Sequence, residues 1–419
     1  MKIAIYGVSR SGKDYLIDRV VNHLNLNSDI KACHIEGSKT LNSIAFETYG
    51  RSFKSLCESD KVALRKKFVD IVNQKEKEYQ LVIVDGHYSF INENSYNVVF
   101  TDEDKNTYDH FFYLDTPSHM IIKFARNSGG EKRNLDITEE QVFNWKLYEK
   151  DELQKVCSLL DKELVILDED AQSCVDFIES WVKGFDEKYS YNKMANNILD
   201  GLTNELSQVN EVLLLDCDKT VSTNDVTYDF CQELDIDSYA LKKIFRNDRY
   251  TSYQFYKVWC LYKSKEAPLI VSASEISLER ANLSNDILGL IKNRRDALVI
   301  GITSGVYQIW DLISKKHDLF NVLIGNTCSN SLDYYVTPLL KRSIVLELQK
   351  RKKNVTAIGD SIIDIPMLES ADFGYIVAHE KVNRVVEKYL VQEKSTQIKQ
   401  IFRSEFGYSL SNVSELEVA

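Results

Sequence analysis

The stretch LLLDCDKTV, residues 213–221, places two carboxylates two positions apart at the end of an apolar run. The apolar run predicts a buried strand, and Asp216 and Asp218 follow at its carboxyl end. Like charges this close repel each other unless a positive charge lies between them. A divalent cation with oxygen ligands supplies that charge, so the stretch predicts a metal site at the edge of a parallel sheet.

Three further motifs follow in order along the chain. ITSG (302–305) ends a second predicted strand, and PLLKRS (338–343) contains Lys341. IGDSIIDIPML (358–368) ends a third strand with Asp360 and, four residues later, Asp364. Because open parallel sheets bind ligands at the carboxyl ends of their strands, the motifs are expected to meet in one crevice, with Asp364 supporting the last of them.

These residue types together predict phosphoryl transfer through a covalent intermediate. Asp216 is expected to attack phosphorus and form an aspartyl-phosphate. Asp218 would protonate the leaving oxygen and later activate water. Asp216, Asp218 and Asp360 make an oxygen-rich site that suits Mg²⁺. Ser304 is expected to hydrogen-bond a phosphoryl oxygen, and Lys341 to neutralise the crowded negative charge.

The ordered motifs DCDKT, ITSG, Lys341 and IGDSIIDIPML resemble those of the haloacid dehalogenase superfamily, especially its phosphoserine phosphatase-like branch. The resemblance covers about residues 211–395 and implies a Mg²⁺-dependent phosphatase. It also implies that Asp218 binds the metal through its backbone carbonyl. Lys219 stands where many members of the superfamily have glycine.

An insert of mostly helical pattern, roughly 223–293, separates the first two motifs. The resemblance implies that this insert is a cap that closes over the crevice, which favours a small phosphomonoester. Arg246, Arg249 and Tyr253 are candidates for substrate contact within the insert. The surface of an amphipathic helix accounts for these three residues equally well.

The other end of the chain carries a phosphate-binding pattern, GVSRSGKD (7–14), between a predicted strand and a predicted helix. Glycines let backbone N–H groups curl around an anion, and the helix N-terminus adds partial positive charge. The lysine would reach the outer phosphates of ATP and take part in the transfer. The expected ATP contacts are Gly7, Arg10, Ser11, Gly12, Lys13 and Asp14.

This loop resembles those of P-loop kinases, in particular phage deoxynucleoside monophosphate kinases and phosphomevalonate kinases, although Asp14 replaces their usual serine or threonine. VIVDGHY (82–88) is similar to a strand end of adenylate-kinase-like enzymes, without the arginine usual shortly after it. The resemblance implies that Asp85 organises magnesium and that Arg126 and Arg133 belong to a lid. A solvated helix face is an equal explanation for the two arginines.

Length and alternating strand and helix patterns predict an α/β protein with two Rossmann-like parallel-sheet domains, the second carrying the helical cap insertion. The expected segments are a kinase-like domain 1–183, a linker helix 184–209, a phosphatase domain 210–405 and a tail 406–419. The net charge of −11 disfavours nucleic acid as a partner. Broken apolar runs and scattered cysteines predict a cytoplasmic protein that does not enter a membrane.

Three functions remain open on these grounds. The first is a bifunctional enzyme that uses ATP and Mg²⁺, with a kinase half for nucleotide-like acceptors and a phosphatase half for a small phosphorylated metabolite or nucleotide. The second is a polynucleotide 5′-kinase and 3′-phosphatase, which the acidic charge and the large insert disfavour. The third is a phosphatase regulated by a nucleotide-sensing domain that does not turn over.

Overall fold

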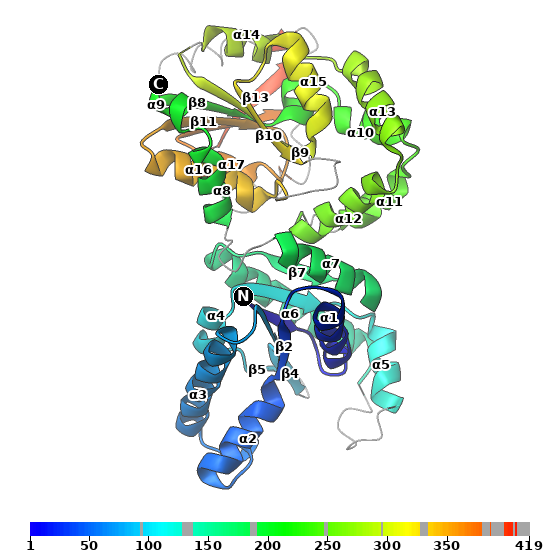
Figure 1. The fold of residues 1–419 in the computed structure, drawn as a ribbon, viewed down its shortest axis with the longest axis vertical. Helices are drawn as coiled ribbons and strands as arrows, with labels where there is room; N and C mark the ends of the chain where they lie inside the picture. Colours follow the sequence, from blue (N-terminus) through cyan, green and yellow to red (C-terminus); the bar gives the residue numbers. More distant parts are fainter. Residues whose placement is uncertain are drawn as a thin grey trace. The chain divides into compact units, whose positions relative to one another are not determined.

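The structure is a computed structural model of the chain, and it describes residues 1–92, 95–127, 137–184, 191–246, 250–294, 296–326, 334–378, 386, 398–404 and 407–408. The chain divides into two compact units, Met1–Lys188 and Tyr189–Ala419 (Figure 1). Each unit is built on a sheet of mainly parallel strands with helices packed on it, which confirms the predicted fold class. No described helix has the length and apolar character needed to cross a membrane.

The elements of the first unit alternate between strands and helices along most of its length. They are β1 Lys2–Tyr6, α1 Lys13–Asn27, β2 Ala32–Glu36, α2 Gly37–Tyr49, a short 3-10 helix Phe53–Ser55, α3 Glu58–Glu76, β3 Leu81–Asp85, β4 Ser89–Asn92, β5 Ser95–Val98, α4 Asp102–Thr107, β6 His110–Leu114, α5 Ser118–Asn127, α6 Glu139–Leu159, β7 Leu164–Leu167 and α7 Ala171–Gly184.

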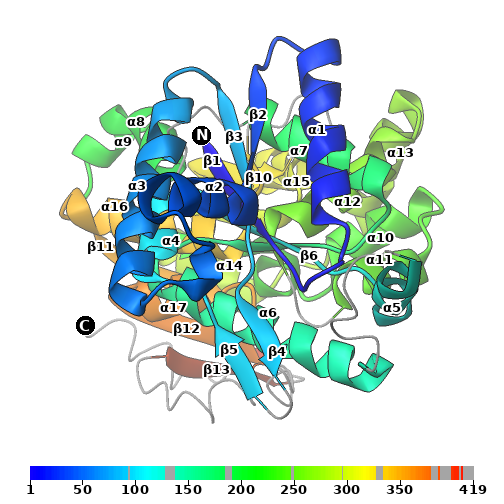
Figure 2. The ribbon, with the colours of Figure 1, turned by 90° about the horizontal axis from the view of Figure 1, so that it is seen from below.

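The main sheet of the first unit has the parallel strand order β2-β3-β1-β6-β7. Strands β4 and β5 form a separate antiparallel pair (Figure 2). The chain winds to one side of β1 through β2 and β3, and then to the other side through β6 and β7. This reversal leaves a crevice at the carboxyl end of β1, where the phosphate-binding pattern begins.

Both faces of this sheet are covered by helices, as its continuous apolar strands require. On one face, Tyr6 and Phe111 belong to a core cluster that includes Leu153 of α6. On the other face, the ring of Phe112 lies 5.1 Å from that of Trp181 in α7. Neighbouring residues of β6 therefore pack against helices on opposite faces of the sheet.

The second unit begins with two helices and then repeats the strand and helix alternation around a helical insert. Its elements are α8 Tyr191–Asp200, α9 Thr203–Ser207, β8 Glu211–Leu215, a turn Cys217–Val221, α10 Val226–Glu233, α11 Ser238–Ile244, α12 Ser252–Lys263, α13 Ala267–Arg280, α14 Asn285–Asn293, β9 Leu298–Val306, α15 Tyr307–His317, β10 Val322–Asn326, α16 Pro338–Lys350, β11 Asn354–Gly359, α17 Ile365–Ser370, β12 Phe373–Ala378, β13 Ile398–Ser404 and β14 Gly407–Tyr408.

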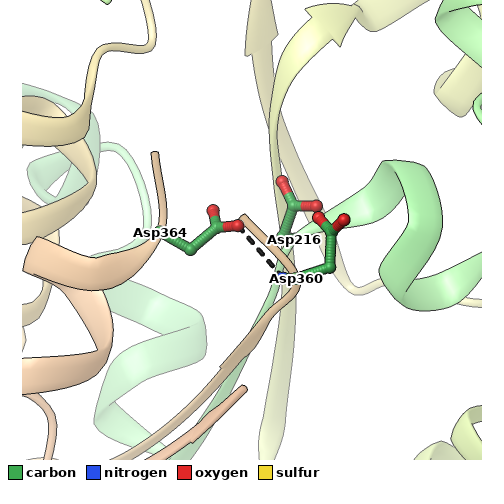
Figure 3. Close-up of side chains that lie close together, drawn as sticks. All are labelled: Asp216, Asp360 and Asp364. Atoms are coloured by element: carbon green, nitrogen blue, oxygen red, sulfur yellow. Dashed lines mark hydrogen bonds between the residues drawn. The ribbon is translucent and has the colours of Figure 1, made fainter. Parts of the chain in front are cut away.

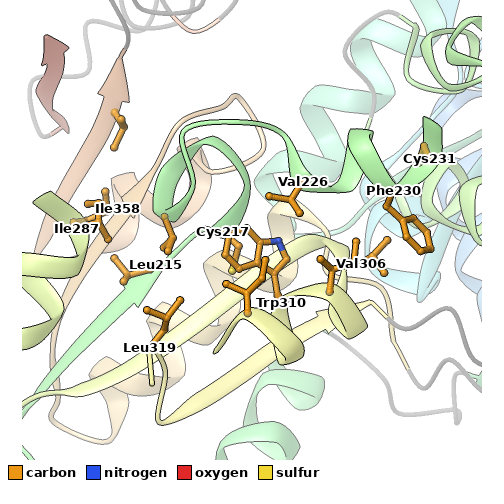
Figure 4. Close-up of a cluster of buried hydrophobic side chains, with 14 of the residues drawn as sticks. Leu215, Cys217, Val226, Phe230, Cys231, Ile287, Val306, Trp310, Leu319 and Ile358 are labelled. Atoms are coloured by element: carbon orange, nitrogen blue, oxygen red, sulfur yellow. The ribbon is translucent and has the colours of Figure 1, made fainter. Parts of the chain in front are cut away.

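Its sheet has the order β10-β9-β8-β11-β12-β13-β14, and only the β13–β14 pair is antiparallel. Strand β8 is the point at which the winding reverses, so ligands are expected at its carboxyl end. A buried cluster lies beside this point and includes Leu215, Val306 and Trp310 (Figure 4). Phe230, from α10 of the insert, belongs to the same cluster. Cys217, between the two aspartates, is fully buried in the same cluster and serves as packing.

The segment predicted as a linker helix, 184–209, contains α8 and α9, and both helices lie within the second unit. Helix α8 buries Met194 and Leu199 and packs against α16. The Arg351 side chain, at the end of α16, donates to the Asn196 backbone carbonyl and forms an ion pair with Asp200. These contacts explain why α8 folds with the second unit, whose sheet also extends to β14 in the predicted tail.

Candidate active site

The first aspartate of the DCDKT motif lies beside the third predicted strand end. The Asp216 backbone N–H donates to the carbonyl oxygen of Ile358 at 2.9 Å, which continues the ladder between β8 and β11 by one residue. Asp360 follows β11, so both carboxylates emerge at the same edge of the sheet (Figure 3). One oxygen from each of Asp216, Asp360 and Asp364 lies within 4.8 Å of the others.

Lys341 lies in the first turn of α16, a helix that Thr337 caps and that starts with a proline. Its side chain is 1% exposed, and Nζ donates to Asp216 Oδ1 at 2.7 Å and to Asp364 Oδ1 at 2.6 Å. Burial alone would lower the pKa of Lys341, but the two carboxylates raise it above its usual value. The lysine therefore remains a cation within the acidic cluster.

Asp364 and Asp360 differ in how their oxygens are used. Asp364 Oδ1 accepts from Lys341, and Oδ2 accepts from the backbone N–H of Asp360 and from the backbone N–H and hydroxyl of Ser361. Among the described residues, none donates a hydrogen bond to the Asp360 carboxylate. Asp364 is thus committed to holding Lys341 and the turn, whereas Asp360 is available as a ligand.

The electrostatics of Asp216 and Asp360 fit a divalent cation. Burial and the neighbouring Asp364 raise the pKa of Asp216 to about 7, although Lys341 opposes this shift. Burial, Asp216 and Asp364 raise the pKa of Asp360 well above its ordinary value. A hard cation between two such carboxylates would favour their charged forms, and Mg²⁺ prefers carboxylate oxygens.

Asp218 is held by two residues that the motifs did not indicate. Its Oδ1 accepts from the Thr227 backbone N–H at 2.9 Å, and its Oδ2 accepts from the Thr227 hydroxyl at 2.8 Å and from Trp310 Nε1 at 3.1 Å. Burial, followed by the Asp225 carboxylate, raises the pKa of Asp218 to about 6, and the donors from Thr227 and Trp310 oppose that rise.

Lys219, directly after Asp218, occupies a backbone position that favours glycine. Lys219 has φ 58°, a left-handed conformation in which glycine is favoured because it lacks a Cβ. The Lys219 amine pairs with Asp225 at 2.6 Å. The Thr220 hydroxyl donates to Asp216 Oδ2 at 3.3 Å, which ties this turn to the first aspartate.

Ser304 of the ITSG motif lies at the carboxyl end of β9, next to β8. Its hydroxyl donates to the carbonyl oxygen of Val336 at 2.7 Å. Asn326 donates to the Ser304 carbonyl and accepts from the Val336 backbone N–H. This network ties β9 to the residue that precedes the α16 cap, and Ser304 must give up its bond to Val336 before it can donate to a phosphoryl oxygen.

Gly305 leaves no room for a side chain beside Asp218. A Cβ added there would lie 2.1 Å from Thr227 Oγ1 and 2.7 Å from Asp218 Oδ2. We expect Gly305→Ala to lower the free energy of unfolding by about 1–3 kcal/mol, measured by urea denaturation. Gly289→Ala is the matched control, because a Cβ in that helix meets nothing within 4 Å and should stabilise by about 0.5–1 kcal/mol. Equal effects of the two changes would contradict this packing.

The candidate substrate contacts in the insert differ in their exposure to solvent. Arg246 is exposed just after α11. Tyr253, on α12, is 1% exposed, so its side chain is buried and does not face a ligand at the surface. Arg249 lies outside the described residues.

In the first unit, GVSRSGKD forms a tight loop between β1 and α1. Gly7, Arg10 and Gly12 all have positive φ, and a Cβ on Gly7 would approach the Leu114 carbonyl oxygen to 3.0 Å. Lys13 is 5% exposed, and its Nζ donates to the carbonyl oxygens of Gly7 at 2.6 Å and Val8 at 3.2 Å. Burial lowers the pKa of Lys13, while Glu149 and Asp85 oppose that change.

A pocket of about 920 Å³ opens at this loop. The loop residues Arg10 to Asp14 line it, together with Asp85 at the end of β3 and apolar side chains of α5, including Met120 and Phe124. Ser11 also lines it, and its buried Oγ has no hydrogen-bond partner among the described residues. The pocket therefore combines a loop of the kind that can bind an anion with apolar side chains on one wall.

The other predicted kinase residues have mixed placements. Asp85 Oδ1 accepts from the Gly37 backbone N–H at 2.7 Å and lies 3.5 Å from His34 Nε2. Burial alone would raise the pKa of Asp85, but His34 and Gly37 lower it, so this carboxylate is charged. Arg126 is exposed near the end of α5 and does not line the pocket. Arg133 lies outside the described residues.

No protein-family profile matches the chain, and no curated protein does. Part of the chain is similar in structure to solved hydrolases. A haloacid dehalogenase family hydrolase from Salmonella enterica serovar Typhi is 18% identical, with TM-score 0.36, over 43% of this chain and 65% of its own. A probable phosphoserine phosphatase from Vibrio cholerae is 15% identical, with TM-score 0.35, over 54% of this chain and 72% of its own. A phosphoserine phosphatase, solved as a phospho-aspartyl intermediate analogue, is 17% identical, with TM-score 0.36, over 50% of this chain and 99% of its own.

Proposed function

We propose that the second unit is a Mg²⁺-dependent phosphatase that hydrolyses a small phosphomonoester through an aspartyl-phosphate on Asp216. The observation that carries this proposal is the arrangement of Asp216, Asp360 and the buried Lys341 at one edge of the sheet. A nucleophilic carboxylate, a second carboxylate for a cation and a fixed positive charge are the groups that phosphoryl transfer to an aspartate requires.

The chemistry of this proposal balances in two steps. A carboxylate oxygen of Asp216 attacks phosphorus, the bond from phosphorus to the leaving oxygen breaks, and that oxygen takes a proton from Asp218. A water molecule then gives a proton to Asp218 and attacks phosphorus, which releases inorganic phosphate and restores Asp216. Mg²⁺ held by Asp216 and Asp360 would supply positive charge beside the phosphoryl oxygens. Lys341 offsets the negative charge of the acidic cluster throughout.

The insert supports a small substrate over a nucleic-acid end. Along the chain, helices α10 to α14 follow β8 and precede β9. The carboxyl ends of these two strands carry Asp216 and Ser304. A net charge of −11 gives a nucleic-acid backbone little electrostatic attraction. Release of phosphate from a panel of nucleotides, sugar phosphates and 3′-phosphorylated oligonucleotides, with Mg²⁺ and with EDTA, tests the proposal. Activity confined to the oligonucleotides would favour end healing, and activity that EDTA leaves intact would contradict the metal requirement.

A second function is proposed for the first unit, in which the loop around Lys13 binds ATP and Mg²⁺ and the γ-phosphate passes to a small nucleotide-like acceptor. The pocket at the loop and the unpartnered Ser11 hydroxyl favour it. Asp14 and Asp85 are the carboxylates that would hold the magnesium ion or its waters. A unit that only senses nucleotide remains the alternative, in which ATP alters the phosphatase rate without being consumed.

Removal of the Lys13 amine should weaken ATP binding strongly. We expect Lys13→Ala to raise the Kd for MgATP by at least about 10-fold, because one charge-assisted contact to phosphate is lost. Isothermal titration calorimetry measures the change. Lys75→Ala is the control, since Lys75 is an exposed lysine of α3 that pairs with Glu78 and does not line the pocket at the loop. Unaltered ATP affinity in Lys13→Ala would remove the nucleotide assignment.

A further inference from the structure

Asp218 receives most of its hydrogen bonds from one residue of the insert. Thr227, in the first turn of α10, donates its backbone N–H to Oδ1 at 2.9 Å and its hydroxyl to Oδ2 at 2.8 Å. Each oxygen of the carboxylate therefore has its own donor on the same residue. Two bonds of this kind fix both the position and the plane of a carboxyl group.

The direction of the Thr227 hydroxyl is itself determined. The backbone N–H of Val306, at the end of β9, points to Thr227 Oγ1 at 3.3 Å and can only donate. Oγ1 accepts that bond and uses its own proton for Asp218. The carboxylate has a third donor, because Trp310 Nε1, on a fully buried ring (Figure 4), donates to Oδ2 at 3.1 Å.

Asp218 also has little room in which to turn. A Cβ on Gly305 would reach 2.7 Å from its Oδ2 and 2.1 Å from Thr227 Oγ1, so the strand lies directly against both groups. A different orientation of the carboxylate consequently requires Thr227 to shift. Thr227 belongs to α10, so such a shift involves the insert.

The insert joins the sheet through two adjacent segments. The Thr223 backbone N–H donates to the Asn282 carbonyl at 2.7 Å, and the Ser284 backbone N–H donates to the Val221 carbonyl at 2.9 Å. Helix α10 starts directly after the first of these segments and is capped by Asp225, which also pairs with Lys219 in the motif turn. The position of α10 is therefore coupled to the turn that carries Asp218.

We propose that Thr227 is a positioning residue that aims the Asp218 carboxylate for proton transfer and makes that aim depend on helix α10 of the insert. The inference rests on the phosphatase function proposed for this unit. A group that gives a proton to the leaving oxygen must be held within hydrogen-bond reach of it, and a carboxylate with one fixed orientation meets that need. The insert would thus set the orientation of the proton donor.

A series of aryl phosphates tests this role, because proton donation matters more as the leaving group becomes poorer. We expect Thr227→Val to lower kcat/KM by about 10²-fold for phenyl phosphate and by less than about 3-fold for p-nitrophenyl phosphate. Thr227→Ser keeps both donors and should restore the wild-type dependence on the leaving group. The ratio kcat/KM is the right quantity, since it reports steps up to formation of the aspartyl-phosphate.

The outcomes separate this inference from the proposed function. Equal losses of kcat/KM on both substrates in Thr227→Val, or no loss at all, would overturn the positioning role while leaving the phosphatase intact. A wild-type protein that hydrolyses neither substrate would instead remove the proposed function. If Thr227→Val does not fold, as judged by circular dichroism, Thr227→Ala provides the same comparison, since it also removes the hydroxyl and keeps the backbone donor.

Discussion

Asp216→Asn is expected to abolish hydrolysis of p-nitrophenyl phosphate, with a loss of at least about 10³-fold in kcat. An amide nitrogen or oxygen cannot replace the carboxylate as the nucleophile at phosphorus. The fold should survive, because the asparagine side chain has the same shape and its oxygen can still accept the bond that Lys341 donates to Asp216 Oδ1 at 2.7 Å.

The control for this experiment is another aspartate of the same unit. Asp311→Asn removes a carboxylate that is part of an i to i+4 ion pair with Lys315 on α15, and it should retain wild-type activity. Circular dichroism and the thermal midpoint of both variants establish that they are folded. Retention of more than about a tenth of the activity by purified Asp216→Asn would exclude an aspartyl-phosphate at this position.

Lys341→Met should produce the largest loss of stability, about 3–5 kcal/mol in the free energy of unfolding without Mg²⁺. Lys341 is 1% exposed and lies between Asp216 and Asp364, so its removal leaves two buried carboxylates without their cation. The unpaired carboxylates would take up protons on folding. The loss should therefore be greater at alkaline pH than at mildly acidic pH, where the protonated groups need no partner.

Mg²⁺ provides an internal check on this prediction. Urea unfolding of Lys341→Met with Mg²⁺ should recover part of the lost stability, because a bound cation replaces some of the missing charge. Lys350→Met is the matched control, since Lys350 lies on the same helix, is exposed and pairs with Glu347 of that helix. A Lys341→Met protein as stable as Lys350→Met at alkaline pH would show that the acidic cluster does not depend on Lys341.

The positions of the two aspartate motifs could be predicted from the sequence because each one directly follows an apolar strand. Runs such as VLLL before Asp216 and TAIG before Asp360 carry a local signal, and parallel strands bring their carboxyl ends to one edge. The same reasoning placed the loop around Lys13 after β1. It also indicated that 223–293 is a helical insert, since the periodicity of that stretch is local too.

The residues that orient the site carry no comparable signal. Thr227 and Trp310 contact Asp218 across 9 and 92 residues of chain, and a threonine or a tryptophan occurs in many unrelated places. The Ser304 bond to Val336 likewise depends on where β9 meets the residue that precedes the α16 cap. Contacts of this kind follow from packing of distant elements, so a single sequence does not reveal them.

The bond between Lys341 and Asp216 joins residues that are 125 positions apart. During synthesis on a ribosome, the proposed nucleophile Asp216 emerges long before Lys341 and the last aspartates that complete its surroundings. A nascent chain that ends before α16 would hold a solvated, unpaired DCDKT loop and release no phosphate. Catalysis would therefore begin only when the unit is nearly complete, and turnover would serve as a reporter of its maturation.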